Sequence, residues 1–457
     1  MIDAETGYVE PPNAEHIAQS FRILLDRSEL TVLAELSDRI WPRKKSWDPS
    51  DREATVVKIA YFSPMPPTRT GIATYSSYLI PALSDQMEID LFEHGDLSRP
   101  GLNYKQFDYT ADPSCLLTLG SYDACIYHIG NQPDYHREIY RVLLRQPGIV
   151  VLHDTVLYSL VAGAGPGALL KELCLDRGYW ALRDWGQILA EAPGGDILRY
   201  PHPERFPLLM RVLRQSSAII VHSETTKRLL SRAGYRRPIQ VVHVPASQSF
   251  ASGVQGTDDV ETRAELGIPS NTLLIGAFGL IRTTKRLEQL LHALDSLDLS
   301  VSFRLLLVGA SGDHPATIET SRITQFIIRR GFVSDADFVR YLAAADIVVN
   351  LRYSTRGEAS LTLIQAMACG RTCIVSNHAW FSELPDDCVC KTAYGRSEVQ
   401  DLGQAIVRLA ADADLRKTIG AAAHGYVLSH CLPASVASEY KAFLEKCCSP
   451  PGNQNFN

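Results

Sequence analysis

The sequence predicts an α/β protein built from two Rossmann-like domains, each organised around a parallel sheet. Short apolar runs rich in β-branched residues alternate with helical segments, which is the pattern of strands that helices bury on both faces. This alternation occurs twice. The stretch 245–259 between the two series is small, polar and rich in glycine and serine, as expected of a linker. A chain of 457 residues with 46% hydrophobic content is long enough to bury two cores.

The first domain is expected at residues 55–246, after a helical N-terminal extension at residues 1–54 whose apolar positions follow helical spacing. Its candidate strands are residues 56–62, 123–129, 148–154 and 218–223. Residues 157–215 predict a long, mostly helical insertion between the last two of these strands. Such an insertion could shape a ligand pocket.

The second domain is expected at residues 257–432, where the same alternation of strands and helices resumes. Its candidate strands are residues 272–279, 303–310, 323–328, 346–350 and 371–377. In open parallel sheets, ligands bind at the carboxyl ends of the strands, so the segments that follow these strands are the first places to look for a site.

Charge and composition exclude several classes of protein. A net charge of −6 gives no general attraction to nucleic acid, and no nucleic-acid partner is expected. No run of 18 apolar residues occurs, and the first residues lack the basic and apolar regions of a secretory signal, so we expect no transmembrane segment and a cytoplasmic location. Arg137, Arg141 and Arg145 recur on one helix face. They predict a solvated surface, and the alternative is a site for an anionic ligand or for a lipid headgroup at a membrane surface.

The stretch 350–385 carries the clearest functional signal. Ser360 can cap a helix from Leu361 to Cys369, with Gly370 just past its end. The amides of Leu361 and Thr362 would then be available to a ligand, and the partial positive charge of a helix start suits a diphosphate. Glu358, just before the helix, would repel phosphate but accept hydrogen bonds from hydroxyl groups. A polyol attached to a diphosphate, such as a nucleotide sugar, satisfies both groups.

Two turns that follow strands add to this interpretation. Lys285 and Arg286 lie at a helix start, where the dipole disfavours cations, and a bound anion between them would explain their position. Gly71 lies in the turn after the first strand, where backbone amides can approach a phosphate or an acceptor. That turn has no GxGxxG pattern, which argues against a dinucleotide-dependent oxidoreductase.

Two DxD sequences, at residues 335–337 and 412–414, could suggest a metal site. Ser334 followed three residues later by Asp337 instead predicts a helix cap, and the second pair falls in a surface helix region. We therefore expect no metal and no cofactor.

The segment GEASLTLIQAMACGRTCIV at residues 357–375 resembles the signature of glycosyltransferase family 4, the retaining enzymes of GT-B fold. The usual pattern has two glutamates eight positions apart. Here Gln365 occupies the position of the second glutamate. The position of the first glutamate, eight residues earlier, is Gly357, and the acidic residue is the next one, Glu358. The resemblance covers about residues 56–445. It implies two Rossmann-like domains that face each other across a cleft, with the acceptor on the first domain and the nucleotide sugar on the second. The last helix, at 433–457, would pack back on the first domain.

The resemblance also implies roles for individual residues. Glu358, His153 and Lys285 would be the catalytic groups, with Glu358 and His153 on the donor sugar and Lys285 and Arg282 on the diphosphate. Gly71, Ser360, Leu361, Thr362, Gln365 and Val333 would complete the donor site, with Gln365 at the ribose and Val333 at the base. His128, Asn131 and His136 would line the acceptor side.

The implied activity is a retaining, metal-independent transfer of a hexose from a nucleoside diphosphate sugar, linked to UDP or GDP. The acceptor would be a glycan, a glycolipid or a small molecule. A phosphorylase, a sugar-nucleotide epimerase and a catalytically silent scaffold with the same fold are the alternatives.

Overall fold

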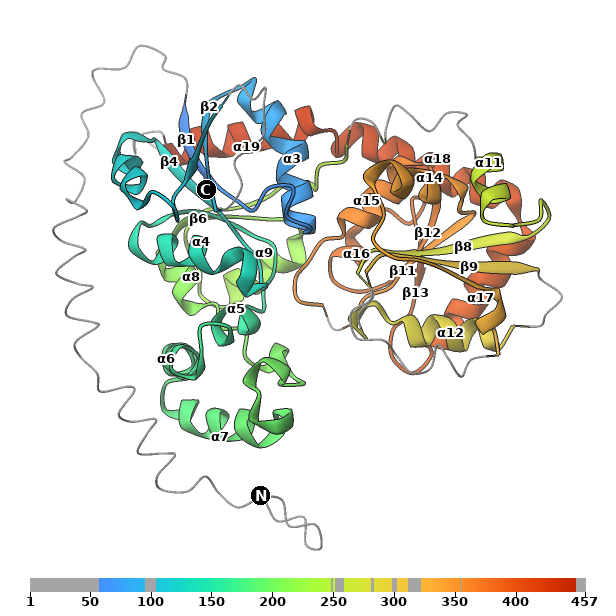
Figure 1. Ribbon diagram of the computed structural model, residues 1–457, viewed down its shortest axis with the longest axis horizontal. Helices are drawn as coiled ribbons and strands as arrows, with labels where there is room; N and C mark the ends of the chain where they lie inside the picture. Colours follow the sequence, from blue (N-terminus) through green and yellow to red (C-terminus); the bar gives the residue numbers. More distant parts are fainter. Residues whose placement is uncertain are drawn as a thin grey trace, which may run out of the picture. The chain divides into compact units, whose positions relative to one another are not determined.

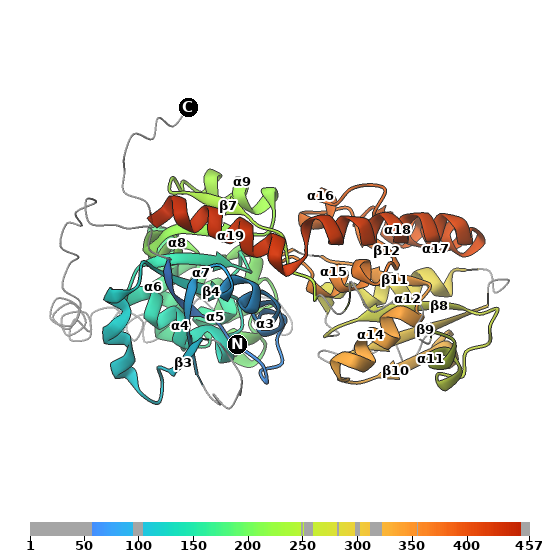
Figure 2. The same ribbon diagram turned by 90° about the horizontal axis from the view of Figure 1, so that it is seen from above.

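The computed structural model describes residues 57–94, 104–247, 250, 259–280, 283–297, 302–310, 322–353 and 355–448, and these form two compact units (Figures 1 and 2). Of the described residues, the first unit contains those up to Val221, Lys227–Gln240 and the residues from Tyr440 to Cys448. The second unit contains His222–Thr226 and Val241–Glu439. The extension predicted at residues 1–54 and most of the predicted linker lie outside the described residues.

The first unit is built on a seven-stranded sheet of order β3-β2-β1-β4-β5-β6-β7. Its strand pairs from β3 through β6 are all parallel. The strands are β1 (Lys58–Phe62), β2 (Glu88–Glu93), β3 (Lys105–Asp108), β4 (Ala124–Ile129), β5 (Gly148–Leu152), β6 (Ser216–Val221) and β7 (Ile239–Val241).

Helices connect these strands, and several of them form the predicted insertion. The helices before the second unit begins are α3 (Gly71–Ser84), α4 (Pro133–Arg145), α5 (Tyr158–Ala162), α6 (Pro166–Arg177), α7 (Ala181–Glu191) and α8 (Met210–Gln215), and α9 (Glu224–Arg232) follows β6. Helices α5 to α7 share a hydrophobic core that includes Tyr158, Leu169 and Ile188. Figure 1 shows α6 and α7 set off from the sheet of this unit, so the predicted helical insertion is confirmed.

The second unit is built on a six-stranded parallel sheet of order β10-β9-β8-β11-β12-β13. The strands are β8 (Leu273–Phe278), β9 (Phe303–Val308), β10 (Ile327–Arg330), β11 (Ile347–Asn350), β12 (Thr372–Ser376) and β13 (Cys390–Thr392). The helices are α11 (Asp259–Glu265), α12 (Leu287–Asp295), α14 (Asp335–Ala344), α15 (Leu361–Ala368), α16 (Trp380–Glu383), α17 (Glu398–Ala411), α18 (Ala413–His430) and α19 (Pro433–Cys448), which contributes its last nine residues to the first unit.

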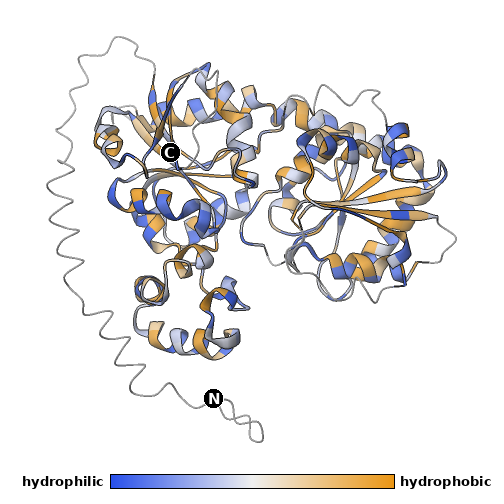
Figure 3. Ribbon diagram, viewed as in Figure 1, coloured by the Kyte–Doolittle hydropathy of each residue, from blue (hydrophilic) through white to orange (hydrophobic). Residues whose placement is uncertain are grey.

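Hydrophobic side chains hold the second sheet between helices. Leucines of α12 and α17 pack on β8, β9 and β11, and α14 lies on the side of the sheet opposite α12 (Figure 1). The strands of both units are predominantly hydrophobic (Figure 3), as expected of sheets covered on both faces. Within the described part of the chain, no helix is both long and apolar enough to cross a bilayer.

The structure confirms the nine predicted strands and adds β2, β3, β7 and β13. Strands β3, β7 and β13 have only three or four residues each, too few for a clear period. Strand β2 has a glutamate at each end, so its sequence does not show the continuous apolar run expected of a buried strand. Strand β10 begins at Ile327 rather than at residue 323, because Thr324–Phe326 form a 3-10 turn.

In each sheet the strand order reverses at one point. The reversal lies between β1 and β4 in the first unit and between β8 and β11 in the second. Connections leave in opposite directions at such a point, which opens a crevice beyond the carboxyl ends of the two strands. Candidate sites are therefore expected at the ends of β8 and β11, and of β1 and β4.

Candidate functional site

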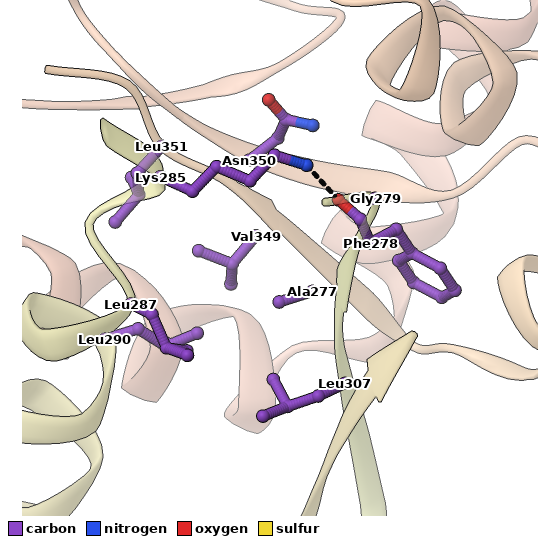
Figure 4. A pocket seen from close by; sticks show the side chains of 10 residues that line it. All are labelled: Ala277, Phe278, Gly279, Lys285, Leu287, Leu290, Leu307, Val349, Asn350 and Leu351. Carbon is purple, nitrogen blue, oxygen red and sulfur yellow. Dashed lines mark hydrogen bonds between the residues drawn. The ribbon is translucent and has the colours of Figure 1, made fainter. Parts of the chain in front are cut away.

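A pocket lies at the reversal point of the second sheet, between the carboxyl ends of β8 and β11. Phe278, Gly279, Lys285 and Asn350 line it together with apolar residues such as Leu290 and Val349 (Figure 4). The pocket therefore combines one cation and one carboxamide with an otherwise apolar lining.

Lys285 is held over the end of β8. Its Nζ donates a hydrogen bond to the backbone oxygen of Phe278 at 2.5 Å (Figure 4). Gly279 has φ +85°, and a Cβ on it would lie 2.5 Å from Lys285 Nζ and 3.3 Å from Thr362 Oγ1. Only glycine fits there without moving the ammonium group. The absence of a side chain at Gly279 thus lets Lys285 approach the start of helix α15.

Asn350, the last residue of β11, is a site residue that the sequence reasoning missed. It is only 4% exposed, and its Oδ1 has no hydrogen-bond partner among the residues that the structure describes. A buried acceptor without a partner costs about 1 to 3 kcal/mol, and such groups mark places where a ligand can complete the bonding. The signal in the sequence was the single polar residue that ends the apolar run DIVVN.

Helix α15 begins beside this pocket as predicted. Ser360 is its N-cap, with Oγ accepting from the amide of Leu363 at 3.2 Å, and Gly370 follows its end at φ +64°. No hydrogen-bond acceptor within the described part of the chain meets the amides of Leu361 and Thr362. Ser360 is buried and serves the cap. Gln365, one turn further on, is also buried.

Glu358 has more partners within the protein than the sequence suggested. Its Oε2 accepts from the amide of Arg356 at 2.6 Å and from Thr355 Oγ1 at 3.4 Å, and its Oε1 lies 3.5 Å from Arg352 Nε. The carboxylate therefore holds the loop before α15. A carboxylate has about four acceptor positions, so these contacts leave room for a ligand hydroxyl.

The interpretation that an anion lies between Lys285 and Arg286 is wrong for Arg286. Its guanidinium binds the carboxylate of Glu398, which is completely buried at the start of α17, and its Nε lies 3.1 Å from both carboxylate oxygens. The carboxylate of Glu398 therefore takes the place of the bound anion that was predicted at Arg286. Of the other donor candidates, Arg282 lies outside the described residues, and Val333 is half-buried just after β10.

In the first unit, His153 follows the end of β5 and pairs with His128 from β4. His128 Nδ1 and His153 Nε2 are 2.9 Å apart, so one ring nitrogen donates and the other accepts. The ring of Tyr75 lies edge-on to His153 with centroids 5.1 Å apart. His153 is partly exposed, whereas His128 is fully buried. The pair therefore fixes the orientation of a single accessible imidazole.

The other first-unit candidates hold the loop after β4. His136 is buried, which lowers its pKa to about 4, and its Nδ1 lies 3.0 Å from the backbone oxygen of His128. The carboxamide oxygen of Asn131 accepts from the amides of Ser159 and Leu160, at 2.9 and 3.3 Å, at the start of α5. Both side chains are engaged within the protein.

Gly71 is the first residue of α3, whose N-cap is Thr70. A Cβ added to Gly71 would meet no described atom within 4 Å, and its φ is not in the left-handed region. The fold itself therefore does not require glycine here. Space in front of a helix start is what a ligand would need.

The DxD sequences act as helix caps. Ser334 Oγ accepts from the amide of Asp337 at 3.1 Å at the start of α14, and Asp412 caps α18 by accepting from the amide of Leu415 at 2.8 Å. Both aspartates of the first sequence lie in the first turn of a helix, where the dipole stabilises them. Across the described ranges, no three His, Cys, Asp or Glu side chains group as metal ligands.

Comparisons with known proteins point to one fold. The sequence profile of the family described as glycosyl transferases group 1 matches residues 272–412, which contain the pocket and helix α15. No curated protein sequence matches the chain.

Among solved structures, sucrose-phosphate synthase from Thermosynechococcus elongatus is 16% identical, with a TM-score of 0.60, over 85% of this chain and 98% of that one. HepE from Anabaena in complex with UDP-glucose is also 16% identical, with a TM-score of 0.60, over 85% and 99% of the two chains. A glycosyltransferase from Rickettsia africae is 14% identical, with a TM-score of 0.61, over 86% and 99%. These likenesses show the GT-B fold with its two Rossmann-like domains.

Proposed function

We propose that this chain, whose residues 272–412 match the family described as glycosyl transferases group 1, is a glycosyltransferase that uses a nucleotide sugar as donor and transfers a hexose with retention of anomeric configuration and without a metal ion. The donor is a nucleoside diphosphate hexose linked to uridine or guanosine. The acceptor is a glycan, a glycolipid or a small molecule.

The observation that carries this proposal is the pocket between β8 and β11. Lys285, the buried carboxamide of Asn350 and the start of α15 all come together at the reversal point of the sheet. A diphosphate bound against Lys285 and the amides of Leu361 and Thr362 would be stabilised in two ways. The ammonium group would donate a charged hydrogen bond, and the start of the helix would contribute its partial positive charge. Such a field can stabilise a leaving diphosphate in the way that a metal ion does in other enzymes.

The sugar is assigned to Glu358, Asn350 and His153. Glu358 would accept from a sugar hydroxyl while it holds the loop before α15, and Asn350 Oδ1 would accept from another hydroxyl. His153 remains the predicted sugar contact of the first unit, and its hydrogen bond with His128 orients its imidazole. His128, Asn131 and His136 remain the predicted acceptor-side residues, and their hydrogen bonds within the protein hold the loop after β4. Gln365 remains the predicted ribose contact, and Val333 the predicted base contact.

The chemistry follows from these placements. The bond between the anomeric carbon and the diphosphate oxygen breaks, and the electron pair leaves with the diphosphate, whose new charge Lys285 and the helix amides stabilise. The acceptor hydroxyl attacks on the face that the diphosphate leaves and passes its proton to a diphosphate oxygen. No protein nucleophile is needed, and configuration is retained. Each well-placed donor to the leaving group contributes roughly 2 to 4 kcal/mol to this step.

HepE has been solved with UDP-glucose, so this is the first donor to test. Release of nucleoside diphosphate from UDP-glucose and GDP-mannose should proceed in EDTA, and Lys285→Ala should abolish most of it. An activity that disappears in EDTA and returns with magnesium or manganese would contradict the metal-free mechanism.

A further inference from the structure

The outer corner of the helical insertion carries exposed aromatic side chains. Helices α6 and α7 are joined there by a single 3-10 turn, Gly178–Trp180. Tyr179 is 91% exposed and Trp180 is 54% exposed, and their rings meet edge to face with centroids 5.6 Å apart. Leu182, in the first turn of α7, is 40% exposed. We refer to Tyr179, Trp180 and Leu182 as the corner patch.

The packing of α7 leaves this patch on the outside. The buried residues of the helix, Ala181, Asp184 and Ile188, are three and four positions apart and therefore share one face. Ala181 and Ile188 belong to the hydrophobic core of the insertion, and Leu182, on another face, is left in contact with solvent. Among the helices of the insertion, α7 lies farthest from the sheet of its own unit (Figure 1). Exposed apolar side chains that lie together, rather than singly, are typical of an interaction surface.

Two arginines add positive charge to the corner. The guanidinium of Arg183 lies 5.7 Å from the ring centroid of Trp180, and it pairs with no carboxylate in the described part of the chain. The side chain of Arg177, which ends α6, is 46% exposed. The chain as a whole has a net charge of −6, so an attraction to an anionic surface has to come from a local group of cations such as this one.

The acidic residues near the corner face inward. Residues 172–190 contain three of them, and each has a partner within the insertion or just after it: Asp184 is 9% exposed and lies 2.8 Å from Arg177 Nε, Asp176 accepts from the amide of Met210 at 3.0 Å, and Glu172 is 6% exposed and lies 2.7 Å from Arg211 Nε. The exposed surface of the corner is therefore apolar and cationic.

This combination fits a lipid bilayer better than it fits a protein. A stable protein interface buries about 800 Å² and roughly 20 to 30 residues on each side, whereas the corner patch has three apolar side chains. A bilayer surface needs no complementary shape. Tryptophan and tyrosine prefer the boundary between headgroups and acyl chains, because each ring is apolar with one polar end. Arginine beside them can bind lipid phosphate.

We infer that the corner patch docks on the surface of a phospholipid bilayer that contains anionic lipid. The insertion is also attached to the loop that carries the predicted acceptor-side residues, because Asn131 accepts from the amides of Ser159 and Leu160 at the start of α5. A membrane contact here would favour a glycolipid among the proposed acceptors. That last step rests on the proposed transferase function, whereas the membrane contact itself does not.

Sedimentation of the full chain with vesicles tests the inference. The probes are vesicles of phosphatidylcholine alone and of phosphatidylcholine mixed with phosphatidylglycerol. The protein should bind the mixed vesicles, and the double variant Tyr179→Ala, Trp180→Ala should bind them at least about tenfold more weakly, because two rings lose their place in the headgroup layer. Arg183→Gln should weaken binding to the mixed vesicles roughly fivefold and have little effect on phosphatidylcholine alone.

A matched control removes two exposed rings from the second unit. Tyr353 and Tyr394 are 45% and 43% exposed, and the double variant Tyr353→Ala, Tyr394→Ala should sediment with the mixed vesicles as the wild-type protein does. Thermal unfolding of the corner variants should match that of the wild-type protein, because the substituted side chains are exposed. Equal unfolding curves would exclude misfolding as the cause of weaker sedimentation.

Three results would overturn the inference. The first is that the wild-type protein does not sediment with the mixed vesicles, and the second is that the corner double variant sediments equally well. The third is that Arg141→Gln with Arg145→Gln abolishes sedimentation while the corner variant does not, which would place the contact on α4. Self-association that the corner variant loses, without any vesicle binding, would make the patch a protein interface. Absence of nucleotide release from any nucleotide sugar would refute the transferase and leave the vesicle result standing.

Discussion

Gly279→Ala is the most informative single substitution because its effect follows from one measured approach. The added methyl would lie 2.5 Å from Lys285 Nζ and 3.3 Å from Thr362 Oγ1. The ammonium is at the end of a flexible chain and can move aside at little steric cost, but it would then leave its hydrogen bond to the Phe278 oxygen. The substitution should therefore displace the charge that is assigned to the diphosphate while leaving Lys285 in the sequence.

A hydrogen bond between an ammonium and a phosphate contributes about 1.5 to 3 kcal/mol, so the loss should weaken binding of the nucleoside diphosphate by about 10- to 150-fold. Alanine at φ +85° should also destabilise the protein by about 1 to 2 kcal/mol. Gly267→Ala is the matched control. Its φ is +67°, and no described atom lies within 4 Å of its Cβ position, so it carries similar backbone strain without touching the pocket.

Calorimetric titration with UDP or GDP, whichever binds the wild-type protein, gives the affinities, and thermal unfolding gives the stabilities. We expect both variants to lose similar stability and only Gly279→Ala to lose affinity. Equal affinities for Gly279→Ala and the wild-type protein would refute the assignment of the diphosphate to Lys285. A matching affinity loss in Gly267→Ala would mean that strain, and not the ammonium, is responsible.

Three further predictions concern individual side chains. Glu358→Gln should lower turnover by roughly 10- to 100-fold, because one charged hydrogen bond to the sugar is lost, and should change the diphosphate affinity much less; full activity in a transfer assay would make this acid purely structural. Asn350→Val should leave thermal stability unchanged or raise it, since an unpaired buried acceptor is removed, and should weaken binding of the nucleotide sugar; lower stability with unchanged affinity would exclude Asn350 from the site. Burial lowers the pKa of His136 to about 4, so the imidazole stabilises the fold above pH 6.5 and this contribution is lost as the pH falls toward 4. Between pH 7 and pH 5 the wild-type protein should lose about 2 kcal/mol more unfolding free energy than His136→Gln, and identical profiles in denaturant titrations would show that the histidine is already protonated or is exposed.

Local patterns made much of the second unit predictable. The start and end of α15 follow from Ser360 and Gly370, because a cap is set by residues that are close in sequence. Ser334 and Asp337 likewise predicted the cap at the start of α14. For these caps the deciding contacts lie within one turn of chain, so residue type and spacing were sufficient.

Features made by distant residues could not be read in the same way. From the sequence, Arg286 was predicted to bind a ligand anion. Its actual partner, Glu398, is 112 residues away, and no local pattern connects the two. Asn350 became a candidate only once its burial was known, and the pocket exists only because β8 and β11 are adjacent in the sheet. Strand order and burial are tertiary properties, and no local pattern in this chain carries them.

Hydrogen exchange at the start of α15 is the most direct test of the donor site. The amides of Leu361 and Thr362 have no acceptor within the described part of the chain, so they should exchange quickly in the free protein. Saturating nucleoside diphosphate, offered as UDP, GDP, ADP and TDP in turn and always with EDTA, should slow exchange in residues 357–365 at least tenfold for one of the four. If a nucleotide that binds by calorimetry left exchange in residues 357–365 unchanged, the diphosphate would bind elsewhere and the pocket between β8 and β11 would not be the donor site.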